Sequence, residues 1–559
     1  MDYEKLAEML FPDITTDPEE YEKIYPPRDL KEGTPVTRLG PSPTGFIHLG
    51  NLFSAFADER IAHQNGGVFF LRIEDTDDKR FVEGAVETVI KALDYFKINF
   101  DEGASIVDGK ETDRGDYGPY HQSHRAKMYQ TFVKRMVQRG QAYPCFLTEE
   151  EIAELRQKQE AEKANPGIYG KWAVSRDLTL EEIESRLAEG KPYVIRLKSN
   201  GASDAAPEDA KTITVPDAIR GDITMPENNM DIVILKANGI PTYHFAHVID
   251  DHFMRTTHVV RGEEWISSLP VHIELFGMMG WEPPIYCHTA HLMKTGENGG
   301  KRKLSKRKDP ELSLEYYRQD GYHPDAVREY LLTLLNSNFE EWRIANPDLP
   351  LEDFEFSPSK MSNSGALFDL DKLSDVCKDV LVKIPAQELA DFMIKWSSEF
   401  DRDAHKLFSE DRDYLIKVLD VGRSGTKPRK DLIYAKQIRD FISYFYDEKF
   451  TIEDSIPENV PKEDAKLILE KYLSAYDHSD DQSAWFDKIR SIGTELGYAA
   501  KPKEYKKNPD LYKGHVGDVS TVIRLAITGR RNSPDVWEIQ QILGEERARK
   551  RISDYIARI

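Results

Sequence analysis

From Thr34 onward, short apolar runs typical of buried strands alternate with segments whose apolar residues recur at helical spacing. The segments 34–39 (TPVTRL) and 68–75 (VFFLRIED) are predicted to be buried strands. The segments 49–64 and 81–96 carry apolar residues at helical spacing. A strand–helix–strand–helix order with short connections is typical of a parallel sheet covered by helices. The predicted fold class of this half of the chain is therefore α/β, of the Rossmann type.

This order is interrupted by a segment of different character. A charged helical pattern at 149–164 is followed by a Pro-Gly break and the short strand 191–198, which predicts an inserted α+β domain. Strand-like runs then return over 231–265, split by an Asn-Gly-Ile-Pro turn, and a helix is predicted at 267–280. A sheet that is interrupted and later completed accounts for both parts.

The pattern divides the chain into six regions. After about Pro310 the chain is mostly helical, and from about Gln387 on it shows no strong strand signal. The predicted regions are an acidic N-terminal extension (1–33), the first half of the Rossmann-type domain (34–117), the inserted domain (118–225), the second half with a basic loop (226–310), a connecting domain (311–386) and an all-helical region (387–559).

Composition narrows the class of protein. The chain has 559 residues, of which 40% are hydrophobic and 31% charged, as in a soluble globular protein with several cores. No apolar run approaches the roughly 20 residues needed to cross a bilayer, and the acidic N-terminus lacks the features of a secretory signal. We therefore expect a cytoplasmic protein without a membrane partner, which we expect to be a monomer.

Cysteine content and net charge exclude two further classes. Cys145, Cys287 and Cys377 lie far apart, which excludes a disulfide framework and a metal knuckle built from cysteine alone. The net charge of −22 argues against a protein that coats nucleic acid through bulk charge, although local basic patches can still bind it.

The first candidate motif is RLGPSPTGFIHLGN, residues 38–51. It stands at the entrance to a predicted helix, where unpaired backbone N–H groups and the helix dipole attract anions. Gly45 and Gly50 leave room for a ligand near the backbone, and His48 can donate to phosphate oxygens. Taken alone, the stretch is equally compatible with a simple Pro-Gly turn capped by His48.

The second candidate motif is the basic loop 296–310, GENGGKRKLSKRKDP. Its glycines are too close together for a Walker A loop, and Arg302 stands where Ser or Thr would hold Mg²⁺. Lys303, Lys306 and Arg307 could grip a polyphosphate as charge develops in a transition state. A solvated charge run or a nucleic-acid patch is the alternative.

Taken together, HLGN and KLSKR resemble the two signature motifs of class I aminoacyl-tRNA synthetases. Within that class, further blocks appear in the order found in the glutamyl-tRNA synthetase family. These are RLGPSPTGFIHLGN, LRIEDTD (71–77), GPYHQSHR (118–125), PTYHFAHVIDDH (241–252), VVRGEEW (259–265) and KLSKR. The C-terminal text ITGRRNSPDVWEIQQILGEERARKRI resembles the helical anticodon-binding region of bacterial-type members. The resemblance implies that the Rossmann-type domain is catalytic and that 387–559 binds the anticodon.

The resemblance also implies a pocket for glutamate. Arg38 and Arg261 could each clamp a carboxylate, which a neutral amide cannot match, and Glu74 could take the α-ammonium. The implied amino-acid-binding residues are Arg38, Ser42, Glu74, Tyr243, His247 and Arg261. A metal-site interpretation of the His- and Asp-rich run 244–252 is disfavoured, because alternate positions of the predicted strand there point to opposite faces.

The implied reaction is attack of the glutamate α-carboxylate on ATP, followed by transfer of glutamate to the 3′ end of tRNA(Glu). Charging of tRNA(Gln) as well is left open. ATP with Mg²⁺ is the expected cofactor. His48, Lys303 and Lys306 are the implied catalytic residues, and Asp77 and Arg80 are implied at the tRNA acceptor end. The implied ATP-binding residues are His48, Gly50, Asn51, Glu264, Lys303, Leu304, Ser305, Lys306 and Arg307.

Some expectations concern what the chain lacks and what else it could be. Some relatives bind zinc through a Cys-x-Cys pair in the inserted domain, but Leu147 follows Cys145 at that spacing, so we expect no structural zinc and name no metal ligand. The basic clusters 501–514 and 547–551 are predicted to be either tRNA phosphate contacts or solvated helix faces. The helical C-terminus disfavours a glutaminyl-type relative, and a non-catalytic tRNA-binding paralogue is the alternative from another class.

Overall fold

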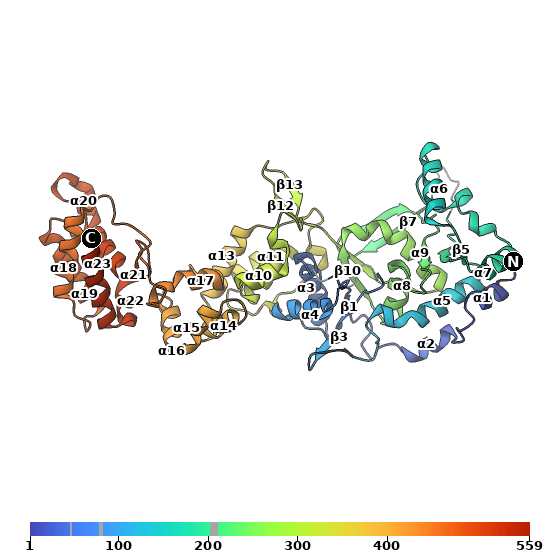
Figure 1. The fold of residues 1–559 in the computed structure, drawn as a ribbon, viewed down its shortest axis with the longest axis horizontal. Coiled ribbons are helices and arrows are strands. Elements are labelled where there is room, and N and C mark those ends of the chain that lie inside the picture. The colour runs from blue at the N-terminus through green and yellow to red at the C-terminus, as the bar shows by residue number, and fades with distance from the viewer. Residues whose placement is uncertain (45–46, 78–81, 202–210) are drawn as a thin grey trace. The chain divides into compact units, whose positions relative to one another are not determined.

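The computed structural model describes residues 1–44, 47–77, 82–201 and 211–559, which form two compact units (Figure 1). Unit 1 comprises Met1–Tyr316 and Arg328–Asp369. Unit 2 comprises Tyr317–Val327 and Leu370–Ile559. Two helices, α10 (Leu314–Asp320) and α11 (Pro324–Leu335), contribute residues to both units.

The first sheet of unit 1 has the predicted parallel core. Strands β1 (Val36–Leu39), β2 (Val68–Leu71) and β3 (Glu102–Val107) are parallel neighbours, and β4 (Lys110–Arg114) is antiparallel to β3. All four residues of β1 and the last three of β2 are buried, as expected for strands covered on both faces. The connecting helices are α3 (Leu49–His63) and α4 (Ala85–Tyr95). The strand–helix–strand–helix prediction is confirmed.

A second sheet completes this arrangement. Strands β10 (His258–Gly262), β11 (Ile285–Thr289) and β7 (Thr212–Asp217) are parallel, and β8 (Gly221–Pro226) is antiparallel to β7. The backbone N–H of Thr257 donates to Val36 O at 2.9 Å, so β10 lies beside β1. Helix α9 (Leu269–Met279) connects β10 to β11. The predicted completion of the sheet is confirmed for β10 and β11, whereas the strand predicted from residue 231 on is β9 (Val233–Leu235), which pairs with β6 (Val194–Leu197) in a separate sheet.

One predicted element is wrong: residues 243–253 form a helix, α8 (Tyr243–Phe253), and not a strand. The β-branched and aromatic residues of this run suggested a strand, but Phe245, Ile249 and Phe253 recur every four residues and are fully buried on one helix face. His247 and Asp251 are therefore one helical turn apart and adjacent. The argument against a metal site from strand alternation fails, although no cluster of three or more metal-ligating side chains occurs in the described residues.

The inserted part of unit 1 is built from a small antiparallel sheet and helices. Strand β6 (Val194–Leu197) pairs with β5 (Ala142–Cys145) on one side and β9 (Val233–Leu235) on the other. Helix α5 (Ala126–Gln138) contacts both β5 and β9. Helices α6 (Glu149–Ala161) and α7 (Leu180–Ala188) complete this part.

The N-terminal extension forms two helices and packs on the inserted part. Helices α1 (Tyr3–Leu10) and α2 (Pro18–Ile24) both contact α5. Leu6 and Leu10 of α1 are buried in the same core as Phe132 and Val137 of α5. The extension is thus part of unit 1 rather than a loose tail.

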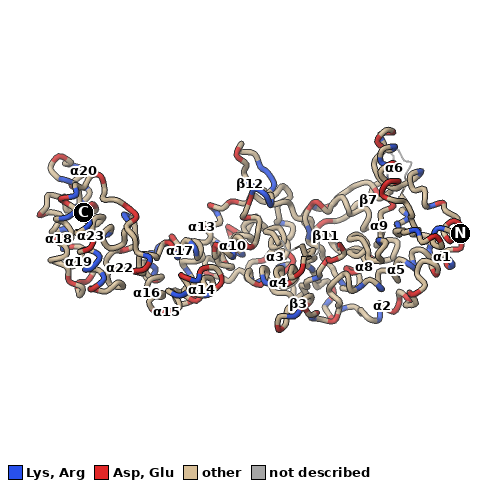
Figure 2. The backbone as a smooth tube through the Cα atoms, in the orientation of Figure 1, with Lys and Arg blue, Asp and Glu red and all other residues tan. Residues whose placement is uncertain are grey.

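The basic loop of the sequence belongs to a short hairpin. Strand β12 (Leu292–Thr295) pairs antiparallel with β13 (Lys301–Lys303) and parallel with β14 (Ala366–Leu367). Figure 2 shows basic residues gathered along this hairpin. Unit 1 also contains the short helix α12 (Phe339–Ala345).

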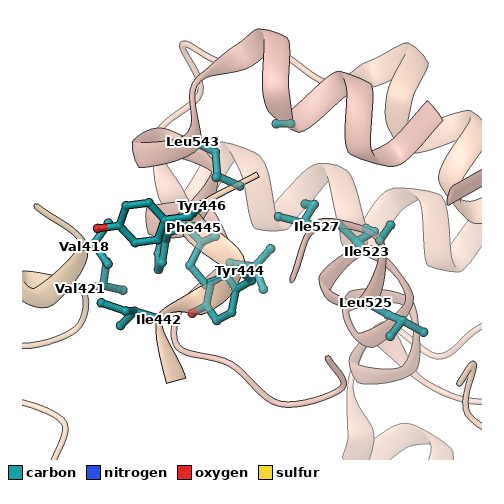
Figure 3. Packing of buried hydrophobic residues seen from close by; sticks show 14 of the residues in the cluster. Val418, Val421, Ile442, Tyr444, Phe445, Tyr446, Ile523, Leu525, Ile527 and Leu543 are labelled. Atoms are coloured by element: carbon teal, nitrogen blue, oxygen red, sulfur yellow. The ribbon is translucent and has the colours of Figure 1, made fainter. Parts of the chain in front are cut away.

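Unit 2 is helical, and none of its described residues forms a regular strand. A single hydrophobic core joins residues as distant in sequence as Val418, Phe445, Ile523 and Leu543 (Figure 3). The helices are α13 (Leu370–Leu381), α14 (Ala386–Phe400), α15 (Arg402–Glu410), α16 (Arg412–Asp420), α17 (Ala435–Phe441), α18 (Lys462–Ala475), α19 (Gln482–Glu495), α20 (Pro502–Lys507), α21 (Val516–Thr528), α22 (Val536–Leu543) and α23 (Glu545–Arg558). Within the described chain, none of the helices is long and apolar enough to span a membrane.

Candidate active site

A cavity of about 650 Å³ opens at the carboxyl ends of β1, β10 and β11. This is the edge of a parallel sheet at which α/β proteins bind their ligands. Most of the residues proposed from the sequence line it: Arg38, Ser42, His48, Gly50, Asn51, Glu74, Asp77, Tyr243, Arg261, Glu264, Lys303 and Leu304. His247, Ser305, Lys306 and Arg307 do not line it, and Arg80 lies outside the described residues.

One side of the cavity is a network of buried charges. Arg72 donates to Asp251 Oδ1 at 2.6 Å and to Glu74 Oε1 at 3.0 Å. Arg38 Nε lies 3.4 Å from the same Asp251 oxygen. Gly40 makes room for this network, because a Cβ there would lie 2.3 Å from Glu74 Oε1. The two acids therefore fix the two arginines at the end of β1 and β2.

Arg38 is available to a ligand. Its side chain is 4% exposed, and its Nε has no hydrogen-bond partner among the described residues. A buried guanidinium with unused N–H groups at a cavity wall is suited to bind a carboxylate. Burial raises the pKa of neighbouring Asp58 well above its ordinary value, which favours the neutral acid and leaves Arg38 uncompensated from that side.

The charges of this side of the cavity do not cancel. Burial raises the pKa of Glu74 as well, while the attraction of Arg72 and Arg38 opposes that shift. Counting Glu74 and Asp251 as ionised and Asp58 as neutral, three guanidinium groups and two carboxylates give one net positive charge. The groups counted are Arg38, Arg72, Arg261, Glu74 and Asp251. A ligand with one net negative charge complements this side of the cavity.

Arg261, at the end of β10, is held by uncharged groups. Its Nε donates to His288 Nε2 at 3.0 Å, and its NH1 lies 3.3 Å from His272 Nδ1. Its guanidinium carbon lies 4.7 Å from the centre of the Tyr286 ring. The arginine is 6% exposed and lines the cavity.

His247 occupies a different place from the one expected. It is fully buried, its Nδ1 lies 2.7 Å from Asp251 Oδ2, and its Nε2 lies 3.2 Å from the Tyr286 hydroxyl. Burial lowers the pKa of His247 to about 3, so the ring is neutral at physiological pH. The side chain supports Asp251 and Tyr286 from behind the cavity wall.

The other side of the cavity is the N-terminus of α3, capped by His48. His48 Nδ1 accepts the Asn51 N–H at 3.3 Å, and Asn51 Oδ1 accepts the His48 N–H at 3.1 Å. Burial lowers the pKa of His48, and because Nδ1 is an acceptor the neutral ring carries its proton on Nε2. Gly50 allows this fold-back, because a Cβ there would lie 3.0 Å from the ring. The entrance thus offers N–H donors suited to phosphate.

The basic hairpin reaches the cavity through Lys303 and Leu304. Lys303 Nζ lies 3.3 Å from His291 Nε2. Arg302 pairs with Asp309 through both terminal nitrogens at 2.6 Å, and Ser305 N donates to Asp309 Oδ2 at 2.8 Å. The hydrogen bond from Arg302 holds the pKa of Asp309 down at about 2, so Asp309 remains ionised and fixes the base of the loop.

Several residues of the site were not identified from the sequence. Arg72 and Asp251 lie inside quoted motifs, so their neighbourhood was the only signal for them. His272, His288 and Asp217 lie on separate elements and come together only through the order of β10, β11 and β7. A single sequence carries no local pattern that would join them.

The two C-terminal basic clusters differ in the exposure and hydrogen bonding of their basic side chains. In 547–551, Arg547, Arg549 and Arg551 donate to backbone carbonyls of other helices or loops, at Leu543, Tyr476 and Ile527 among others. These arginines hold unit 2 together, which is neither of the two interpretations made from the sequence. In 501–514, Lys503, Lys506 and Lys507 of α20 are exposed. Trp537 packs against the core of unit 2 and donates to Asp480 O at 2.9 Å.

The three cysteines are free and buried. Cys145 accepts a weak hydrogen bond from Ser175 Oγ at 3.6 Å within the inserted part. Burial raises the pKa of the Cys287 and Cys377 thiols, which makes them inert packing residues.

Comparison with known proteins identifies the class of this protein. Residues 35–375 match the family model described as tRNA synthetases class I (E and Q), catalytic domain, and residues 388–556 match an anticodon binding domain. The chain belongs to the class I tRNA synthetases of this family, as its motifs predicted.

Its relatives narrow the family further. The chain is 64% identical over 553 residues to a glutamate–tRNA ligase of Acetivibrio thermocellus, covering 99% of each chain. It is 48% identical over 561 residues to one of Clostridium perfringens, covering 100% of each. Among solved structures it resembles a glutamate tRNA ligase from Elizabethkingia meningosepticum in complex with its amino acid, with a TM-score of 0.73 and 27% identity over 94% of this chain and 99% of that one.

Proposed function

We propose that this chain attaches L-glutamate to the 3′ end of tRNA(Glu) in an ATP-dependent reaction through a glutamyl-adenylate. The observation that carries the proposal is the excess of one positive charge on one side of the cavity, among the five groups Arg38, Arg72, Arg261, Glu74 and Asp251. Glutamate carries two carboxylates and one ammonium, hence one net negative charge. Glutamine is neutral overall and would leave the excess charge uncompensated.

The residues of the cavity divide into two groups in this proposal. Arg38 and Arg261 bind the carboxylates of glutamate, Glu74 binds the ammonium, and Ser42 and Tyr243 complete the wall. His48, Gly50 and Asn51 at the α3 N-terminus receive phosphate oxygens of ATP. Lys303 and Lys306 neutralise charge that develops on the phosphates, Leu304, Ser305 and Arg307 complete their loop, and Glu264 lies at the nucleotide side.

The chemistry needs no side-chain nucleophile. The α-carboxylate of glutamate attacks the α-phosphorus of ATP, the bond to the β-phosphate breaks, and pyrophosphate leaves. A ribose hydroxyl of the tRNA then attacks the activated carbonyl and AMP leaves. Catalysis consists of positioning and charge stabilisation by the groups named above. Mg²⁺ is expected to enter with ATP, held chiefly by phosphate oxygens.

Two assays test the proposal. Glutamate-dependent ATP–pyrophosphate exchange in the presence of tRNA separates an enzyme from a non-catalytic tRNA-binding paralogue. The absence of exchange in a folded preparation that still binds tRNA would contradict the proposal. Charging of purified tRNA(Glu) and tRNA(Gln), measured side by side, then decides whether the second tRNA is also a substrate.

A further inference from the structure

We propose that His272 and His288 are positioning residues that set the preference of the cavity for an anionic substrate, because they hold Arg261 through uncharged nitrogen acceptors. This inference rests on the proposed function, in which Arg261 binds a carboxylate of glutamate. An arginine anchored by carboxylates loses much of its attraction for a further anion. An arginine anchored by neutral acceptors keeps it.

The first acceptor, His288 of β11, is fixed in one tautomer by Asp217 of β7. The ring Nδ1 lies 2.7 Å from Asp217 Oδ2, and both side chains are fully buried. Asp217 Oδ1 is in turn fixed by the N–H groups of Ile219 and Arg220, each at 2.9 Å. A carboxylate only accepts, so the His288 proton resides on Nδ1 and the Nε2 lone pair faces Arg261 at 3.0 Å.

The second acceptor, His272 of α9, is fixed by another histidine. Its Nδ1 lies 3.3 Å from Arg261 NH1, and its Nε2 lies 3.0 Å from His244 Nδ1. Since a guanidinium only donates, His272 Nδ1 must be unprotonated, and the ring proton lies on Nε2. His272 is fully buried. Burial lowers the pKa of both His272 and His288, which agrees with neutral rings.

Together these contacts hold Arg261 without neutralising it. Within the described parts of the chain, no carboxylate lies within 4.0 Å of Arg261, whereas Arg38 and Arg72 share Asp251. Two of its nitrogens are bound by imidazoles, and its plane lies over Tyr286. The geometry therefore combines a fixed guanidinium with an uncompensated charge at the cavity wall.

The variants His272→Asn and His272→Asp form a matched pair that separates the effect of the acceptor's charge from the effect of its size. Asn and Asp have nearly the same size, and the side-chain oxygen of each can replace the Nδ1 acceptor. We expect His272→Asn to keep glutamate recognition, with a KM for glutamate within about threefold of the parent. His272→Asp should raise that KM on the order of tenfold over the Asn variant. The KM for ATP and kcat should change little in both, and the preference for glutamate over glutamine should fall only in the Asp variant.

Equal KM values and equal glutamate preference in the two variants would overturn the inference, because acceptor charge would then have no effect. Asp217→Asn tests the other side of Arg261 should His272→Asp fail to fold. An amide there donates to His288 Nδ1, shifts the ring proton to Nε2 and turns that acceptor into a donor facing Arg261. We expect a higher KM for glutamate, together with imidazole ¹⁵N shifts that report the changed tautomer.

The two proposals fail in different ways. If the parent protein shows no glutamate-dependent exchange, the proposed function fails, whereas the His288 tautomer can still be read from its ¹⁵N shifts. The inference about the histidines alone fails under three conditions. The parent is active, His272→Asn and His272→Asp have the same KM for glutamate, and Asp217→Asn leaves the His288 tautomer unchanged.

Discussion

At the scale of single residues, His247 links burial to pH dependence. Its folded pKa is lowered to about 3, by burial first and against the attraction of Asp251, whereas an unfolded histidine titrates near 6.5. The unfolded chain therefore binds the proton first as pH falls, and stability decreases below about pH 6.5. The titratable and charged groups that face His247 are Asp251, Arg261, Arg38, Tyr243, Tyr286 and His272.

We expect that lowering the pH from 7.5 to 5.0 reduces the free energy of unfolding of unit 1 by about 2 kcal/mol more in the parent protein than in the His247→Asn variant. Urea unfolding at the two pH values measures this. Tyr286→Phe is the control, since it removes the same hydrogen bond at His247 but no group that titrates in this range. Its pH-dependent loss should match the parent. An equal loss in His247→Asn and the parent would show that folding does not lower the pKa of His247.

The basic loop provides a second residue-scale prediction. In the proposed function Lys306 acts on the transition state, although it does not line the cavity in this structure. We expect Lys306→Ala to slow adenylate formation by about 10²–10³, with a change in ATP affinity below about tenfold. Stopped-flow or quench measurements of adenylate formation, with ATP binding measured separately, give both values. The control is Lys308→Ala, which removes a nearby exposed charge and should leave the rate of adenylate formation and the ATP affinity within about threefold of the parent. Comparable losses in rate and affinity for Lys306→Ala would contradict the assigned role.

The sequence was sufficient to find motif residues that line the cavity and insufficient to find the residues that support them. Arg38 and Arg261 lie at the ends of strands and Glu74 follows one, the hydrophobic pattern shows these strands, and all three residues line the cavity. His272 and His288 are 16 positions apart on a helix and a strand, and their common contact depends on how α9 returns to the sheet. Such contacts depend on tertiary packing, for which one sequence has no local signal.

At the scale of elements, the N-terminal extension fixes the end of α8, the helix that carries Tyr243, His247 and Asp251. Arg28 donates to Met254 O, at the α8 C-terminus, and to both Glu102 oxygens of β3 at 2.7 and 3.0 Å. Glu22 accepts from Arg255 and lies 2.7 Å from His252. The acidic extension, to which the sequence assigned no role, thus connects the catalytic sheet to this helix.

This connection is testable through Arg28, whose side chain is 7% exposed. Arg28→Ala removes the cation from a largely buried ion pair with Glu102 and the donor at Met254 O, so we expect a loss of about 2–3 kcal/mol in the unfolding free energy of unit 1. Urea unfolding measures it. Lys5→Ala, which removes the exposed ion pair between the extension and Glu184 of α7, should cost clearly less, because exposed ion pairs contribute little to stability. Equal effects of the two substitutions would show that the extension does not support α8 through Arg28.

Element prediction from the hydrophobic pattern succeeded where one periodicity dominates. Strands β1 and β2 are short apolar runs bounded by turns, and α3 and α4 are amphipathic or buried helices of sufficient length. The run that became α8 is rich in aromatic and β-branched residues, so strand propensity competed with a four-residue apolar repeat. The helix forms because it buries the apolar repeat against α5 and α9, which outweighs the strand propensity of the individual residues.

At the scale of the whole molecule, the net charge of −22 makes local positive surfaces decisive for any contact with tRNA. The two C-terminal basic clusters are not equivalent in this respect. Arg551 is 5% exposed, donates to Ile527 O and pairs with Asp447 at 2.6 Å, so it stabilises unit 2 from within. The lysines of α20 are exposed and are therefore the better candidates for phosphate contacts.

We expect the triple variant of the α20 lysines to change the salt dependence of tRNA binding rather than the fold. If Lys503, Lys506 and Lys507 each contact a phosphate, their replacement by alanine reduces the magnitude of the slope of log Kobs against log salt by about 0.7–0.9 per contact, hence by about 2.1–2.7 in all. Filter binding at several salt concentrations measures the slope. For Arg551→Ala we expect the free energy of unfolding to fall by about 2–4 kcal/mol. The salt slope of tRNA binding, measured on the folded fraction of this variant, should be unchanged. An unchanged slope in the lysine variant would place the tRNA contacts of unit 2 on another surface, because counterion release counts phosphate contacts independently of the tRNA's sequence.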